Sequence, residues 1–137
     1  MKLDSTAFLA GNDLIEALSR LGSKVECDGD VVLFEQGESP SGLYVLHTGE
    51  VVLTMKTHEG EEALNANATT GALLGLPGVV GNLPYSLTAV AKKGSNVSFV
   101  EREKFSQLML KEPNLAMQVL QVLAAEVRAA RNILKEQ

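Results

Sequence analysis

Short runs of β-branched and aliphatic residues, each ended by glycine or another turn residue, fill the chain from Lys24 to Val100. Segments of this length and composition predict β-strands, and their regular spacing is typical of an antiparallel sandwich or roll. The runs are VVLFEQG, GLYVLHTGEVVLTM, EEALNAN, SLTAVA and NVSFV. The central region therefore predicts a mainly β fold with flanking helices, of the double-stranded β-helix or jelly-roll type.

One hairpin turn can be placed from the sequence. His47-Thr48-Gly49-Glu50 separates two alternating runs, Leu43 to Leu46 and Val51 to Met55. In such a turn the glycine is expected to supply a positive φ angle. Similar corners are predicted at Gly37, Gly60, Gly71 and Gly94.

Helical patterns lie on both sides of the β region. Asp13 to Leu21 carries apolar residues at helical spacing, with Asn12 as the expected N-cap and Gly22 as the end of the helix. Towards the C-terminus, Arg102 to Lys111 predicts a short helix. Proline is favoured in the first turn of a helix, so Pro113 is expected to open a longer one that runs nearly to the last residue.

Length and composition indicate a single domain. The chain has 137 residues and is 45% hydrophobic, which is enough for one self-sufficient core. We divide the domain into an N-terminal helical segment (1–22), a β-roll (23–100) and C-terminal helices (101–137).

Charge and apolar patterning exclude several classes of partner. The net charge of -5 has the wrong sign for a protein whose main ligand is DNA or RNA.

The apolar run Leu73 to Leu83 is interrupted by glycines and a proline, so no membrane span is predicted. A single cysteine, Cys27, cannot form an internal disulfide, and we expect a cytoplasmic protein.

The last predicted helix carries two apolar stripes. The narrower one, Leu115, Val119 and Val122, suits packing against the roll. The other has the alternating steps of four and three of a coiled-coil seam, over about three heptads. We expect this seam to form a homodimer interface, although a helix that only docks on its own domain would also be amphipathic. The seam consists of Ala116, Leu120, Leu123, Val127, Ala130 and Leu134.

Three segments together resemble the sensor half of the catabolite-activator (CRP) and FNR family of bacterial regulators. They are VVLFEQGESPSGLYVLHTGEVVLT, GALLGLPGVVGNLPYSLTAVA and FSQLMLKEPNLAMQVLQVLAAEVRAARNIL. The resemblance runs from about Val25 to Leu134 and implies a cyclic nucleotide-binding-like β-roll followed by a dimerisation helix. The helix-turn-helix domain that follows the sensor in full regulators is not expected here, so direct DNA binding is not expected either.

In that family a phosphate-binding cassette holds the ligand, and here it corresponds to Gly75 to Ala89, GLPGVVGNLPYSLTA. The resemblance places Leu76 where the family has a glutamate for the ribose and Tyr85 where it has an arginine for the phosphate. Pro77 also removes one backbone N–H. Residues 129–131, AAR, offer no hydroxyl to a purine. A cyclic nucleotide is therefore a possible ligand that is disfavoured in the usual pose, and no cofactor is certain.

Two interpretations of this altered cassette stay open. In the first, Tyr85 lies in a repurposed pocket and its phenol gives one directed hydrogen bond to a less charged ligand. In the second, the apolar side chains fill the former site. Arg131 could also replace the missing cation by reaching in from the helix. The candidate ligand-binding residues are Gly75, Leu76, Pro77, Gly78, Val79, Tyr85, Ser86, Leu87 and Arg131.

Catalytic and metal-binding patterns are missing from the sequence. His47 and His58 stand eleven residues apart with no H-x-H, which argues against a metal-binding cupin, and we expect both in exposed turns. Cys27 is expected to be a small buried residue. No catalytic motif is recognisable, so an enzyme is not expected.

Two functions remain as hypotheses. One is a dimeric small-molecule sensor that moves its long helices and acts through another protein. The other is a constitutive dimerisation or protein-interaction module without a ligand.

Overall fold

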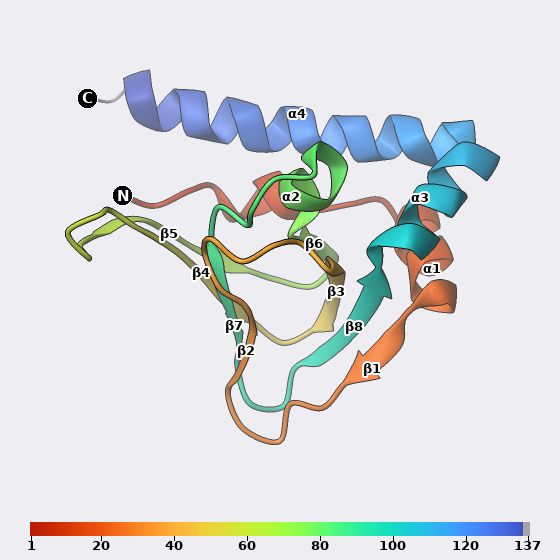
Figure 1. Ribbon diagram of the computed structural model, residues 1–137, viewed down its shortest axis with the longest axis horizontal. Coiled ribbons are helices and arrows are strands. Elements are labelled where there is room, and N and C mark those ends of the chain that lie inside the picture. The colour runs from red at the N-terminus through yellow and green to blue at the C-terminus, as the bar shows by residue number, and fades with distance from the viewer. Residues whose placement is uncertain (136–137) are drawn as a thin grey trace.

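The computed structural model describes residues 1–135 and shows a β-roll crossed by one long helix (Figure 1). The roll consists of two antiparallel sheets of four strands each, in the orders β1-β8-β3-β6 and β2-β7-β4-β5. The predicted jelly-roll fold is therefore confirmed. The strands are β1 (Ser23–Val25), β2 (Val31–Phe34), β3 (Gly42–Thr48), β4 (Val51–Lys56), β5 (Glu62–Ala68), β6 (Ala72–Leu74), β7 (Thr88–Ala91) and β8 (Asn96–Glu101).

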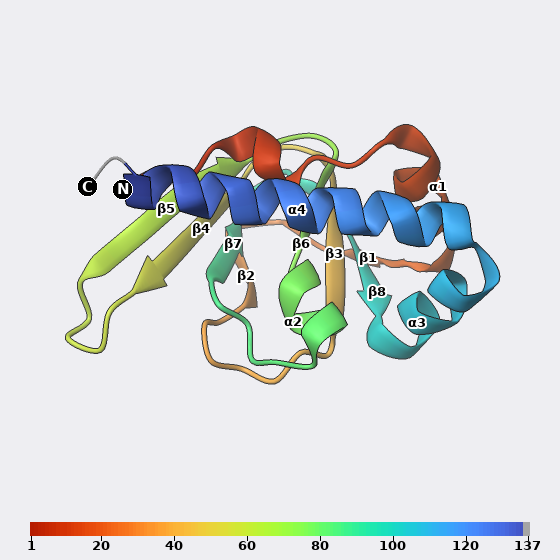
Figure 2. The same ribbon diagram turned by 90° about the horizontal axis from the view of Figure 1, so that it is seen from above.

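The helices lie on one side and at one end of the roll. The long helix α4 crosses the whole width of the roll, with the N-terminal segment along one of its sides and α2 along the other (Figure 2). Helices α1 and α3 pack together at the end where α4 begins. The helices are the 3-10 turn η1 (Ser5–Phe8), α1 (Asn12–Leu21), α2 (Leu76–Gly81), α3 (Arg102–Lys111) and α4 (Pro113–Lys135).

The helix boundaries follow the predicted signals with one correction. Gly22 ends α1, α3 has the predicted bounds, and Pro113 is the first residue of α4. The N-cap of α1 is Gly11 and not Asn12, which lies in the first turn. The carbonyl of Gly11 accepts the first helical hydrogen bond, from the Ile15 N–H at 3.1 Å. A glycine has no side chain to accept from the other N–H groups of the first turn, so no side-chain cap is formed.

The predicted glycine corners form, and Gly49 shows why a glycine is required. Its φ is 104°, and a Cβ on it would lie 2.3 Å from the hydroxyl oxygen of Ser95. The predicted hairpin is wrong, because this turn joins β3 to β4, which lie in different sheets and do not pair with each other. His47 lies near the end of β3 and is half-buried, not exposed, with Nε2 2.8 Å from the hydroxyl oxygen of Ser98. His58 is exposed in a turn, as expected. The other predicted corners also have positive φ, at Gly37, Gly60, Gly71 and Gly94.

Two separate apolar clusters make up the core. One fills the inside of the roll and contains small residues on the inner faces of β5 and β7, including Ala66, Ala68, Ala89 and Ala91. The other lies between β3, β8 and the helices, where Leu14 and other side chains are fully buried. The large side chains of the second cluster are Leu14, Leu18, Leu43, Leu73, Leu76 and Phe105.

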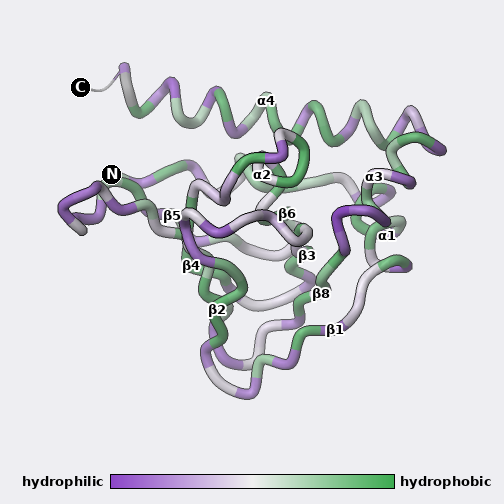
Figure 3. Tube along the Cα trace, viewed as in Figure 1, coloured by the Kyte–Doolittle hydropathy of each residue, from purple (hydrophilic) through white to green (hydrophobic). Residues whose placement is uncertain are grey.

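The two clusters meet along α4, whose hydropathy alternates over most of its length (Figure 3). The first half of α4 contributes Val119 and Val122 to the second cluster, and the second half contributes Ala129 to the cluster inside the roll. The predicted packing stripe of α4 is therefore confirmed, and α4 covers the opening of the roll.

Candidate ligand-binding site

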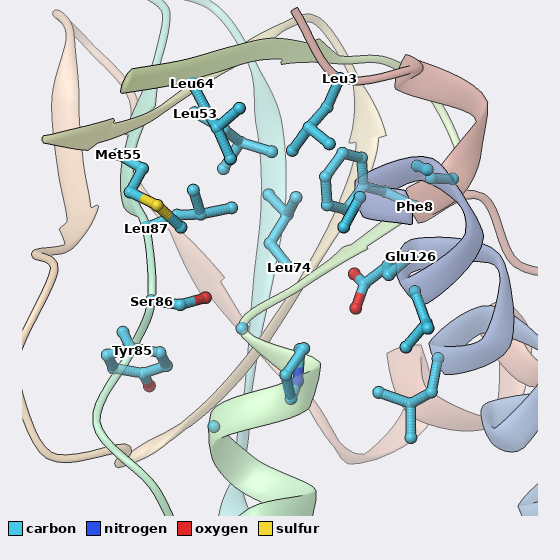
Figure 4. A pocket seen from close by; sticks show the side chains of 18 of the residues that line it. Leu3, Phe8, Leu53, Met55, Leu64, Leu74, Tyr85, Ser86, Leu87 and Glu126 are labelled. Atoms are coloured by element: carbon cyan, nitrogen blue, oxygen red, sulfur yellow. The ribbon is translucent and has the colours of Figure 1, made fainter. Parts of the chain in front are cut away.

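A cavity of about 280 Å³ lies between the roll and the second half of α4 (Figure 4). One wall consists of apolar side chains from β4, β5 and the segment before β7, such as Leu53, Met55, Leu64 and Leu87. Leu3 and Phe8 from the N-terminal segment complete the apolar wall.

The cassette forms a second wall of the cavity and is held by Tyr85. The Tyr85 ring is 4% exposed and stacks on Phe34 with 4.1 Å between the ring centroids. Its hydroxyl donates to the carbonyl oxygen of Gly42 at 2.5 Å and accepts from the N–H groups of Ser41 and Gly42 at 3.2 and 3.3 Å. The phenol oxygen is therefore already bonded to the main chain.

Gly75 and Gly78 let this ring approach the start of α2. Gly75 has φ 85°, and a Cβ on it would lie 2.9 Å from Cε1 of Tyr85. A Cβ on Gly78 would lie 3.3 Å from Cδ1 of the same ring. The helix α2 has only six residues, so its N-terminal turn makes up most of it. The Tyr85 ring thus occupies the space directly beside the N-terminal turn of α2.

The cassette residues named from the sequence divide into two groups. Gly75, Pro77 and Gly78 line the cavity, as do Tyr85, Ser86 and Leu87. Leu76 and Val79 point the other way, into the cluster between β3, β8 and the helices, with exposures of 0% and 5%. On a short helix, neighbouring positions face different directions, so a contiguous cassette in the sequence cannot all face the ligand space.

The third wall belongs to α4 and contains a carboxylate that sequence reasoning missed. Glu126 points from α4 into the cavity (Figure 4). Its Oε2 is buried and has no hydrogen-bond partner among the described residues. Burial raises the pKa of Glu126 to about 8. A signal was available: position 126 continues the inward stripe of Leu115, Val119 and Val122 with the same steps of four and three.

Comparison with known proteins identifies the family. The sequence profile described as "Cyclic nucleotide-binding domain" matches residues 24–112, which is more than half of the chain. The chain belongs to the cyclic nucleotide-binding domain family. This finding confirms the resemblance seen in the sequence.

The cyclic nucleotide-binding domain also resembles individual regulators and solved structures. The fumarate and nitrate reduction regulatory protein of Yersinia pestis is 26% identical over 102 residues, covering 74% of this chain and 40% of the relative. The catabolite activator protein of Thermus thermophilus has a TM-score of 0.79 at 22% identity, covering 91% of this chain and 59% of that protein. Oxidised CprK in complex with o-chlorophenolacetic acid has a TM-score of 0.76 at 14% identity, with 95% and 53% covered.

These comparisons support a regulatory role at the level of the family. The chain spans about two fifths of the length of the curated relatives that it matches. By name, one of those relatives is a regulatory protein and the other is a transcriptional activator. Within residues 1–135, no helix has the length and hydrophobicity needed to cross a bilayer.

The predicted seam of this domain lies beside the cavity on α4. Leu120 and Val127 are 55% and 51% exposed, and Ala130 is exposed too. Ala116 and Leu123 are half-buried. The side chain of Leu134 lies outside the described part of the structure. A continuous outer strip of apolar surface therefore follows the helix.

Two further sequence predictions concern single residues. Arg131 is exposed and does not belong to the cavity wall. Cys27 is buried, as expected, and burial raises the pKa of its thiol. A buried thiol with a raised pKa is protonated at neutral pH and is a poor nucleophile.

Proposed function

We propose that this domain is a non-catalytic sensor that dimerises through the outer face of α4 and binds a small molecule in the cavity beneath that helix. Its output would pass through another protein by a change in the position of α4. The observation that carries this proposal is the cavity itself, one wall of which is formed by the helix that also bears the exposed apolar strip.

The cavity wall and the predicted dimer seam share part of α4. The shared residues are Leu123, Val127 and Ala130. A ligand that contacts these side chains would also change the position of residues that would contact a second copy of the domain. Binding and dimer geometry would then be coupled, because interactions at the two faces bias the same helix.

A cyclic nucleotide in the usual pose is not the proposed ligand. The side chain beside the start of α2 is Tyr85, and its hydroxyl is bonded to Gly42, so no cation is available there for a phosphate. Removing one partner of a buried charged pair costs about 2–5 kcal/mol, and each 1.4 kcal/mol is about a factor of ten in affinity. Glu126 adds an acid to the same cavity, and the described residues of the wall include no lysine or arginine.

Calorimetric titration with cyclic AMP, cyclic GMP and a cyclic dinucleotide tests this part of the proposal. We expect dissociation constants in the millimolar range or no measurable heat. Micromolar binding of any of the three would contradict the proposed pose and would require another cation at the phosphate, for which Arg131 would be the first residue to replace.

Dimerisation is tested by placing a charge on the outer strip. We expect the native protein to sediment as a dimer at tens of micromolar. Leu120→Glu should weaken the dimer by about a hundredfold or more, because a central apolar contact of an interface is worth roughly 2 kcal/mol or more. Gln121→Glu, an exposed position one residue further along α4, is the matched control and should leave the dimer intact. A monomeric native protein would contradict the proposal.

The second candidate function is a constitutive dimerisation module without a ligand. The packing of Tyr85 supports it, since the ring and hydroxyl take up the space beside α2. The cavity that remains supports the sensor. A protein that dimerises but binds none of a varied set of small molecules would favour the module.

A further inference from the structure

The buried carboxylate of Glu126 restricts what the cavity can accept. Oε2 is shielded from solvent and lacks a hydrogen-bond partner in the described part of the chain. A buried polar group without a partner is costly, and such groups in native proteins usually have a function or bind something. Glu126 is therefore the feature of the cavity that most needs a partner.

The neighbouring wall offers Glu126 no compensating charge. Among the described residues that line the cavity, Glu126 is the only one with an acidic side chain. Before a ligand binds, it is mostly protonated at neutral pH, because burial raises its pKa to about 8. The other polar side chains of the wall are Ser86 and Tyr85, and the Tyr85 hydroxyl is already bonded to Gly42. No arginine or lysine of α4 is paired with Glu126: Arg128 and Arg131 are both exposed. A ligand that carries a hydrogen-bond donor could supply the partner that the described residues do not.

The electrostatics favour a cation or a neutral donor over an anion. An entering amine can take the Glu126 proton, which leaves a carboxylate and an ammonium group. In an apolar environment these attract more strongly than in water, whereas two carboxylates repel each other. Donors to an ionised acceptor also form the stronger hydrogen bonds. The apolar remainder of the wall, from Leu53 to Leu87, requires an apolar body on the same molecule.

The volume sets the size of that body. An engineered protein cavity of about 150 Å³ accommodates benzene. The present cavity of about 280 Å³ is roughly twice as large and lies near the lower end of the range for ligand sites. It has room for one ring with a short substituent.

We propose that the cavity binds a small amine with an apolar, aromatic or branched body, and that Glu126 pairs with its ammonium group. This inference rests on the proposed sensor function and specifies the ligand class for the same site. It differs from the carboxylic acid in the complex of CprK, since the buried group on α4 is itself an acid.

Three isosteric probes test the inference by changing only the polar group. They are 2-phenylethylamine, 2-phenylethanol and phenylacetate, which present a cation, a neutral donor and an anion on the same ring. We would titrate each into isotopically labelled native protein and follow backbone amide shifts by NMR. The reporters of the site are the amides of Gly75, Gly78 and Ala130, whose residues line the cavity.

The expected order of affinity is amine, then alcohol, then acid, with at least about a tenfold difference between amine and acid. Glu126→Gln should remove most of the preference for the amine and change the affinity for the alcohol by less than about threefold. Glu103→Gln, on the exposed face of α3, is the matched control and should preserve the order. Thermal melts of both variants check that they fold.

The outcomes separate this inference from the proposed function. If phenylacetate binds best, or if Glu126→Gln leaves the preference for the amine unchanged, the ligand class is wrong and the sensor function stands. If none of the probes shifts the reporter amides at about 10 mM, both the ligand class and the sensor function are contradicted.

Discussion

The two halves of α4 lie over different surroundings. Under the first half, Val119 and Val122 pack into a cluster with fully buried leucines from α1, β3 and β6. Under the second half, Leu123 and Glu126 face a cavity. One amphipathic pattern continues through both halves, so the difference comes from what the rest of the chain brings beneath the helix.

This contrast separates the residues that hold the fold from those that can serve a ligand. The first half meets large side chains on α1 and α3, including Leu18 and Phe105. The second half lies over the cavity, whose wall includes Leu53 and Leu64. That space is where a ligand of the proposed sensor would bind.

The largest loss of stability is expected from a charge placed in the tightly packed cluster under the first half of α4, which we call the closed cluster. Leu76 is fully buried among Leu14, Leu43 and other apolar residues, so Leu76→Glu would bury a carboxylate without a partner. We expect a loss of several kcal/mol of unfolding free energy, on the order of 4 or more, or no folded protein at all. Urea denaturation followed by circular dichroism measures it.

This prediction also bears on the family's cassette glutamate. Restoring Glu at position 76 would not rebuild a nucleotide site if Leu76 belongs to the core. A Leu76→Glu, Tyr85→Arg double variant that folds and binds cyclic AMP would contradict our placement of this residue.

Side-chain truncations under the two halves of α4 should differ in their cost in unfolding free energy. Leu18→Ala in the closed cluster is expected to cost about 3–4 kcal/mol, because it removes a fully buried side chain and leaves a new cavity. Leu123→Ala should cost about 1 kcal/mol, since Leu123 is half-buried beside existing space. Chemical denaturation of both variants measures the difference. Equal losses would mean that the second half is as tightly packed as the first.

A smaller effect on stability is expected when the pH is raised. Glu126 has a folded-state pKa of about 8, above its ordinary value of 4.5, so the folded state holds a proton that the unfolded state releases between these values. Stability from this group is full below about pH 4.5 and is lost as the pH rises through 8.

Glu126→Gln isolates this contribution. We expect the variant to match the native protein near pH 5 and to exceed it by about 2 kcal/mol at pH 8.5, less than the pKa difference implies because water enters the open cavity. Thermal or urea unfolding at several pH values measures the crossing. A constant difference between the two proteins from pH 5 to 8.5 would rule out a buried, titrating Glu126.

The smallest effect is expected at the Tyr85 hydroxyl. Tyr85→Phe keeps the stack on Phe34 but removes the bond to the Gly42 carbonyl. The cost should be about 1–2 kcal/mol, the loss of a buried hydrogen bond that leaves main-chain groups unpaired. Denaturation midpoints measure this cost. Tyr44→Phe is the comparison, because it removes another tyrosine hydroxyl that donates to a main-chain carbonyl, that of Leu33. No loss in Tyr85→Phe would mean that the phenol is free for a ligand.

Much of the fold could be predicted because it depends on local patterns. Gly49 and Gly22 punctuate the chain where the backbone turns, and Pro113 opens α4, as expected. The direction of the cassette side chains could not be predicted from their order. Whether Leu76 faces the cavity or the core depends on the sheet that packs beneath α2, which is a long-range contact.

The role of Glu126 was missed for a related reason. On α4 attention fell on the apolar positions of the seam, whereas Glu126 is a polar residue on the inward stripe. A charged residue in such a stripe is a signal in the sequence. What the sequence does not contain is the size of the space that Glu126 faces, since this depends on how the walls from β4, β5 and the N-terminal segment come together beneath α4.

The unequal support of α4 has a consequence for backbone hydrogen exchange. Amides between Leu115 and Val122 lie over the closed cluster, so they should exchange only when the whole domain unfolds. Amides between Leu123 and Ile133 lie over the cavity and can open locally at lower free energy. One unbroken helix would then show a step in protection near Leu123. A compound that occupies the cavity should raise the protection of the second part alone.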